Sequence, residues 1–192
     1  MRIGLLGGTF DPIHLGHLRA AENAREALAL DRVAFIPSGA PPHRGGPVSP
    51  ALDRFAMVCL ATASHPRFLA WDDEVRRPGP SYTVETLAGL RDSRPGDAFV
   101  MIVGSDTFPE MASWRDPDRL FRLCTVAVVD RPGEGPLAGP PPPGSRDVTR
   151  VAGPGLPISA TVIRERVRRG ESVRYLVPEA VCDFIAKRGL YA

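Results

Sequence analysis

The sequence has no long apolar run and no excess of charge of either sign. No stretch approaches the roughly 18 apolar residues that a membrane-spanning helix needs. The first residues lack the form of a signal peptide, because Asp11 interrupts the early apolar run. With 24 basic and 22 acidic residues, the net charge of +2 gives no support for a nucleic-acid or membrane partner. We therefore expect a cytoplasmic globular protein, and 192 residues suffice for one domain with a substantial core.

Cysteine is also scarce. The three cysteines, Cys59, Cys124 and Cys182, are widely spaced and odd in number, and each lies in an apolar segment. This pattern favours buried free thiols over a disulfide framework or a cysteine-based metal site.

Short apolar strands alternate with amphipathic helices along the chain. The expected strands are 2–6, 32–37, 68–71, 98–103, 125–129 and 147–151, and the expected helices are 15–30, 49–64, 83–90, 162–169 and 178–187. This alternation predicts an α/β fold with a doubly wound, mostly parallel sheet covered on both faces. We expect one domain over residues 1–192, with a Gly/Pro-rich surface loop at about 132–145 and a C-terminal helical part at 158–192.

The most informative block is Gly7-Gly8-Thr9-Phe10-Asp11-Pro12-Ile13-His14-Leu15-Gly16-His17, which directly follows the first apolar strand. Two glycines turn the chain into a helix whose N-terminus carries two histidines. Helix N-termini favour anions, and the imidazoles add groups that stabilise phosphate charge. Two plainer interpretations are a tight turn with a capping histidine and a zinc site. The zinc site is disfavoured because no further Cys or His with ligand spacing lies nearby.

A second block, Ile158-Ser159-Ala160-Thr161-Val162-Ile163-Arg164, begins a basic helix. Ser159 at a helix start is commonly only an N-cap, and the arginines that follow are commonly a solvated face. The functional interpretation is a second helix N-terminus, with a hydroxyl and Arg164 directed at polyphosphate.

Together, the two blocks resemble the nucleotidyltransferase superfamily and, within it, the bacterial nicotinate-nucleotide adenylyltransferase family. Further matches cover nearly the whole chain in order: Pro41-Pro42-His43-Arg44, Ser81-Tyr82-Thr83 with Glu85-Thr86-Leu87, Gly104-Ser105-Asp106, Trp114, Arg131-Pro132-Gly133 and Gly189-Leu190-Tyr191. The Gly/Pro-rich stretch after Arg131 matches no motif of the family.

The resemblance implies a Rossmann-like nucleotidyltransferase that transfers the adenylyl group of ATP to nicotinate mononucleotide. The products would be deamido-NAD (nicotinate adenine dinucleotide) and pyrophosphate, in NAD biosynthesis, with Mg²⁺ on the triphosphate as the only cofactor and no metal held by the protein. The implied catalytic residues are His14, His17 and Arg164. The implied ATP-binding residues are Gly8, Thr9, Phe10, His14, His17, Gly104, Asp106, Ile158, Ser159 and Arg164.

The same resemblance assigns an acceptor side to the molecule. The implied substrate-binding residues are Thr9, Arg44, Tyr82, Thr83, Trp114 and Arg131. Arg44 and Arg131 would bind the mononucleotide phosphate, and Thr83 and Trp114 would frame the pyridine ring. Plainer roles stay open: a core aromatic for Trp114, helix caps for Thr83 and Asp106, and a surface charge for Arg131. His43 is unassigned, and His65 is expected in a loop.

Rival functions also stay open at this stage. One is another adenylyl- or cytidylyltransferase of the same fold, with phosphopantetheine, an alcohol phosphate or nicotinamide mononucleotide as acceptor. A second is a nucleotide-binding regulator that does no chemistry, and a weaker third is nucleic-acid binding by the basic helix 162–169. The sequence leaves the oligomeric state undetermined, with a homo-oligomer as one option.

Overall fold

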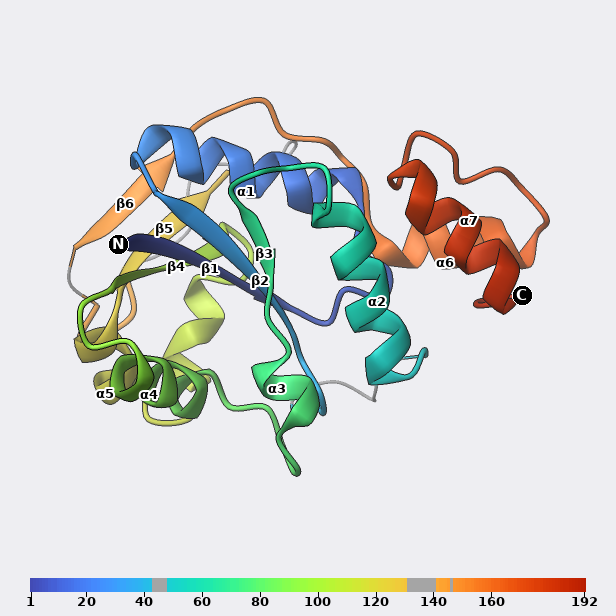
Figure 1. The fold of residues 1–192 in the computed structure, drawn as a ribbon. Coiled ribbons are helices and arrows are strands. Elements are labelled where there is room, and N and C mark those ends of the chain that lie inside the picture. The colour runs from blue at the N-terminus through green and yellow to red at the C-terminus, as the bar shows by residue number, and fades with distance from the viewer. Residues whose placement is uncertain (43–47, 131–140, 146) are drawn as a thin grey trace.

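A six-stranded parallel sheet forms the centre of the molecule in the computed structural model, which describes residues 1–42, 48–130, 141–145 and 147–192 (Figure 1). The strands are β1 (Arg2–Gly8), β2 (Arg32–Pro37), β3 (Phe68–Ala70), β4 (Ala98–Gly104), β5 (Thr125–Val129) and β6 (Val148–Val151). Their order is β3-β2-β1-β4-β5-β6, and all pairs are parallel. The predicted α/β fold is therefore confirmed, and the strand order reverses between β1 and β4.

Helices cover both faces of this sheet. They are α1 (Leu15–Ala27), α2 (Ala51–Thr62), α3 (Asp73–Arg76), α4 (Thr83–Ser93), the 3₁₀ helix η1 (Pro109–Ser113), α5 (Pro117–Leu123), α6 (Ala160–Arg168) and α7 (Glu179–Arg188). Helix α1 runs along one face and α4 and α5 lie along the other, while α6 and α7 extend beside α2 (Figure 1). Each face buries its own apolar cluster. Ile163 of α6 and Val181 of α7 belong to the cluster under α1 and α2, and Leu87 of α4 and Leu120 of α5 to the other.

Several helix boundaries differ from the sequence prediction; α4, for example, extends to Ser93 rather than to residue 90. Helix α1 ends at Ala27 rather than at residue 30, because Ala29 has a φ of 49° and leaves the helix. Ser49 does not cap α2, since Pro50 is the N-cap and the Ser49 hydroxyl contacts Asp11 instead.

Three short helical segments, α3, η1 and α5, were not predicted. They span only four to seven residues, too few for an apolar period to be recognised. The start of α5 did carry a signal, because Asp116 accepts a hydrogen bond from the Arg119 N–H and Pro117 follows it.

The cysteines are free thiols as expected, but only one of them is buried. Burial raises the pKa of Cys124 to about 12, whereas Cys59 and Cys182 are half-buried. Among the described residues, no helix has the length and apolar character needed to cross a membrane.

Candidate active site

A cavity of about 250 Å³ opens where the strand order reverses, at the carboxyl ends of β1, β4 and β5. Such a switch point is where parallel α/β sheets bind ligands, because the flanking loops diverge there. One wall is the start of α1, and the opposite wall is the segment that leads into α6. Five predicted ATP-binding residues line this cavity together: His14, His17, Gly104, Ile158 and Ser159.

The two histidines of the first block lie against each other at the N-terminus of α1. Their rings are stacked, with centroids 3.7 Å apart and planes 22° apart. The His14 backbone N–H donates to His17 Nδ1 at 3.3 Å, so the proton of a neutral His17 ring is on Nε2. His17 can therefore offer Nε2–H as a hydrogen-bond donor to a ligand.

The helix end is less open to an anion than the sequence suggested. The Leu15 N–H donates to the Leu176 carbonyl at 3.0 Å, and the His17 N–H turns back to the His14 carbonyl. Gly16 makes room for the His14 ring, since a Cβ there would lie 3.0 Å from its Nδ1. His14 is the N-cap of α1, as the capping interpretation expected, and the backbone amides at this end are partly used within the protein.

The second block forms the other wall. Ser159 is the N-cap of α6, as predicted, and its hydroxyl accepts from the Val162 N–H at 3.3 Å. Within the described part of the chain, the N–H groups of Ala160 and Thr161 have no protein acceptor. This helix end is therefore the more open of the two for anion binding.

Arg164 joins the two blocks. Its Nη1 donates to the Asp11 carbonyl at 2.8 Å and its Nη2 to Thr161 Oγ1 at 3.2 Å. Its Nε is buried and has no hydrogen-bond partner among the described residues. A guanidinium has five donors, so Arg164 keeps several for a ligand.

The other predicted ATP-binding residues surround this arrangement without lining the cavity. Gly8 ends β1, and the buried Phe10 packs edge-on against the His17 ring at 5.1 Å. Phe10 therefore helps to orient His17. Asp106 is exposed beyond β4 and accepts from the Thr107 N–H, but Phe108 is the N-cap of η1, so the capping alternative for Asp106 is wrong.

Two of the predicted acceptor residues lie on the opposite face of the sheet. Tyr82 and Trp114 are half-buried and pack against the apolar cluster that α4 and α5 cover. Thr83 is the first residue of α4 and Tyr82 is its N-cap, so the plainer alternative that Thr83 caps this helix is wrong. Arg115 stacks over the Tyr82 ring at 4.4 Å, which brings the segment after η1 beside the start of α4. Arg44 and Arg131 lie outside the described residues, as does most of the predicted surface loop.

Sequence reasoning missed Arg54, a fully buried guanidinium on α2. It donates to three backbone carbonyls: to Thr9 at 2.7 Å, to Gly39 at 3.1 Å and to Ser49 at 3.2 Å. Burial lowers the pKa of Arg54, and the nearby Asp11 acts in the opposite direction. Arg54 thereby ties the first block to the loop after β2, and no local motif announced this because Thr9 and Gly39 are 45 and 15 residues away in sequence.

A second missed group holds the first block from the C-terminal side. The Asp11 carboxylate is buried and accepts from the Ser49 hydroxyl, from the Val48 N–H at 2.6 Å and from the Tyr191 hydroxyl at 2.6 Å. Burial and the adjacent carboxylate raise the pKa of Tyr191, so it stays a donor. The matched tail Gly189-Leu190-Tyr191 is thus a support for the first block.

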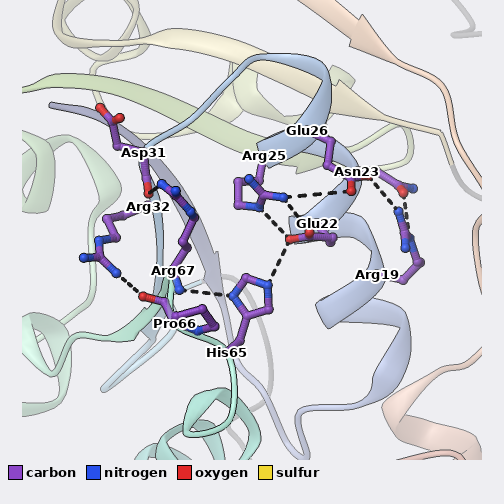
Figure 2. Close-up of polar contacts among 10 residues, drawn as sticks. All are labelled: Arg19, Glu22, Asn23, Arg25, Glu26, Asp31, Arg32, His65, Pro66 and Arg67. Atoms are coloured by element: carbon purple, nitrogen blue, oxygen red, sulfur yellow. Dashed lines mark hydrogen bonds and ion pairs between the residues drawn. The ribbon is translucent and has the colours of Figure 1, made fainter.

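Asn23 also lines the cavity and was not predicted. Its Nδ2 donates to the Pro154 carbonyl at 3.2 Å, and Arg19 Nε donates to its Oδ1. The available signal was spacing, since Asn23 shares a helix face with Gly16 and Ala20. Figure 2 shows the neighbouring polar contacts of α1, where His65, in its expected loop, approaches Glu22.

Comparison with known proteins places this site in a family. The model of the family described as "Cytidylyltransferase-like" matches residues 5–166, which include both blocks. The chain therefore belongs to the cytidylyltransferase-like family of nucleotide-binding α/β proteins. Within that family it belongs with the nicotinate-nucleotide adenylyltransferases, as the resemblance of its motifs indicated.

Relatives of this narrower family match along their full length. A probable nicotinate-nucleotide adenylyltransferase of Thermus thermophilus is 48% identical over 191 residues, covering 100% of both chains. A relative of the same name from Leifsonia xyli is 44% identical, covering 99% of this chain and 94% of its own. In fold, the chain is similar to a Plasmodium falciparum nicotinic acid mononucleotide adenylyltransferase solved with NaAD, with a TM-score of 0.83 at 16% identity over 99% of this chain and 97% of that one.

Proposed function

We propose that this protein transfers the adenylyl group of ATP to nicotinate mononucleotide, forming nicotinate adenine dinucleotide and pyrophosphate in NAD biosynthesis. The observation that carries the proposal is the cavity between two helix N-termini, lined by His14 and His17 on one side and Ile158 and Ser159 on the other. The names of the full-length relatives support the same reaction.

The chemistry needs alignment and charge stabilisation more than proton transfer. The nucleophile is the phosphate of the mononucleotide, which is already anionic and attacks the α-phosphorus of ATP as pyrophosphate leaves. No covalent enzyme intermediate and no strong general base are required. His17 Nε2–H and Arg164 would donate to phosphate oxygens whose charge grows during the transfer.

The remaining roles are part of the same proposal and come from the resemblance of the motifs. Ser159 and the open N–H groups at the start of α6 would bind the polyphosphate, and Gly104 and Asp106 would hold the adenosine end. Thr83 and Trp114 would frame the pyridine ring, and Arg44 and Arg131 would bind the mononucleotide phosphate. The divalent ion, for which we propose Mg²⁺, would enter with ATP as part of that substrate. A cytoplasmic location and a possible homo-oligomer stay predictions.

The test is an acceptor screen with purified protein, ATP and Mg²⁺, in which pyrophosphate release is followed. Nicotinate mononucleotide, nicotinamide mononucleotide and phosphopantetheine are compared at equal concentration. We expect the highest kcat/KM for nicotinate mononucleotide and a dinucleotide product by mass. Turnover with phosphopantetheine alone, or binding of ATP without any turnover, would overturn the proposal.

A further inference from the structure

The segment that leads into α6 forms one wall of the cavity, and we call residues 152–158 the strap. It runs along α1 from the end of β6 to the start of α6 (Figure 1). Its cavity-lining residues are Gly155, Leu156, Pro157 and Ile158, and those of α1 are Gly16, His17, Ala20 and Asn23. The distance between the strap and α1 therefore sets the width of the cavity.

One buried side chain of α1 holds the strap. Asn23 is 5% exposed, and its Nδ2 donates to the Pro154 carbonyl at 3.2 Å. Within the described part of the chain, this is the only hydrogen bond between the strap and another segment. Arg19 Nε donates to Asn23 Oδ1 at 2.7 Å (Figure 2). Because Arg19 occupies the oxygen of the amide, the NH₂ group is the end that faces the carbonyl.

The backbone of the strap also lies directly against α1. A Cβ at Gly153 would lie 2.6 Å from Asn23 Nδ2, so this close approach requires glycine. A Cβ at Gly16 would lie 3.3 Å from the Leu156 carbonyl oxygen, so the two segments approach again about two turns earlier along α1. Of these two contacts, only the one at Asn23 includes a hydrogen bond.

An amide at this place does more than fill space. The chain has one asparagine and no glutamine, so its only carboxamide lies here. Burying an amide is unfavourable unless it is hydrogen-bonded, and a leucine of the same branched shape would fill the same volume. Gly153 and Gly155 flank Pro154, and glycines leave the backbone free to take several paths. The hydrogen bond to Pro154 selects one path and so fixes how the strap enters α6 at Ser159.

We propose that Asn23 is a positioning residue for ATP, which sets the distance between the strap and α1. The inference rests on the proposed function, in which ATP occupies this cavity. His17 on α1 and Ser159 after the strap would contact one nucleotide, so their separation must match it. A displacement of about 1 Å is enough to weaken such a site strongly. The pyridine end of the acceptor would be affected less, because Tyr82 and Trp114 pack on the opposite face of the sheet.

The test uses Asn23→Leu, which keeps the size and branching of the side chain but removes both hydrogen bonds and adds no charge. We expect the KM for ATP to rise about fivefold or more, the factor that one ordinary hydrogen bond contributes. The KM for nicotinate mononucleotide should change less than about twofold. Gly153→Ala should act in the same direction, because its Cβ would push the strap away from Asn23. The matched controls, which should change neither constant, are Ala27→Leu at an exposed position of α1 and Gly96→Ala, whose added Cβ meets open space.

Calorimetric titration with the α,β-methylene analogue of ATP, and separately with nicotinate mononucleotide, gives the same comparison without turnover. A wild-type protein that binds the analogue but makes no dinucleotide contradicts the proposed function, and the Kd values then decide the role of Asn23. Weaker analogue binding by Asn23→Leu with retained affinity for the mononucleotide supports the inference. Unchanged analogue binding, or equal weakening of both substrates, overturns it, because the amide would then be only structural. If Asn23→Leu does not fold, the same comparison of Gly153→Ala with Gly96→Ala decides.

Discussion

At the scale of single residues, hydrogen bonds decide which atom of a side chain faces the ligand. His17 Nδ1 accepts the His14 N–H and Phe10 packs against the ring, which leaves Nε2–H as the donor. Arg164 is held at one nitrogen by the Asp11 carbonyl. Both side chains are thus oriented before substrate arrives, and preorganised donors contribute most to charge stabilisation.

His17→Ala should lower kcat by at least about a hundredfold while the fold persists. Removal of one preorganised donor to developing phosphate charge costs roughly 3 kcal/mol of transition-state stabilisation. His14→Ala should also impair the reaction, with more effect on binding. Steady-state kinetics and a thermal melt measure this, with His65→Ala as the control because His65 contacts Glu22 away from the cavity. A folded His17→Ala protein with near-normal kcat would refute the assignment.

Arg164→Ala should impair use of ATP more than use of the mononucleotide. A charge-assisted hydrogen bond to polyphosphate contributes about 1.5–3 kcal/mol, so kcat/KM for ATP should fall roughly ten- to a hundredfold. Arg164→Lys should restore only part of this, since lysine lacks the planar fork. Arg168→Ala, an exposed position on the same helix, serves as the control. Equal ATP kinetics in the Arg164→Ala and wild-type proteins would show that the arginines of α6 are only a solvent-exposed face and do not bind ATP.

At the scale of elements, the N-termini of α4 and α6 have backbone N–H groups without a protein acceptor in the described part of the chain. At the N-terminus of α1, some of these groups already donate to protein carbonyls. Tyr82 caps α4 without a side-chain hydrogen bond, and its carbonyl accepts from the Glu85 and Thr86 N–H groups. The N–H groups of Thr83 and Val84 have no protein acceptor in the described part of the chain. Donors and a positive helix end suit a carboxylate, which only accepts hydrogen bonds.

We therefore expect nicotinate mononucleotide to be preferred over the amide by at least about a hundredfold in kcat/KM. The amide would turn an NH₂ donor toward these N–H groups, and an unpaired buried donor costs about 1–3 kcal/mol in addition to the lost charged contact. Trp114 would stack equally on the ring of the acid and on that of the amide, so it would not discriminate between the two mononucleotides. Steady-state kinetics with both mononucleotides at fixed ATP provide the measurement. Comparable values would indicate a dual-specificity enzyme.

At the scale of the whole molecule, the C-terminal helices are fastened to the first block through Asp11. The Tyr191 hydroxyl donates to Asp11 across 180 residues of sequence, and Leu176 accepts from the first amide of α1. The carboxyl ends of the strands, α2 and the C-terminal tail therefore form one packed unit around the signature residues.

Tyr191→Phe should lower the Tm by about 5 °C. The lost hydrogen bond to a buried carboxylate stabilises the fold by about 1.5–3 kcal/mol, and in a chain of this size each kcal/mol shifts Tm by roughly 2–4 °C. Differential scanning calorimetry measures the shift. Tyr175→Phe is the control, because Tyr175 is 87% exposed. Equal melting of the two variants would show that Asp11 does not need this donor.

The sequence alone determined the alternation of strands and helices, the parallel sheet and the two signature blocks. These features depend on local patterns, namely apolar periodicity and a serine cap at Ser159, and the structure confirms them. The expected glycine turn is wrong, because Gly7 and Gly8 both pair with β2 inside β1 and the turn follows at Asp11 and Pro12. The short helices α3, η1 and α5 were not predicted, because a helix of so few residues is too short to show an apolar periodicity. The family follows from the order of the motifs, which the comparison confirms.

Only the tertiary structure decided which groups are occupied and which remain available to a ligand. The start of α1 gives its first amide to Leu176, Ser49 leaves its helix to contact Asp11, and Arg54 and Glu74 bind partners from separate segments. None of these contacts has a sequence signature, because each joins residues that come together only when the sheet is wound. A hydrogen bond between distant segments forms only where the fold brings the donor and the acceptor together. The local sequence around one partner does not reveal the other.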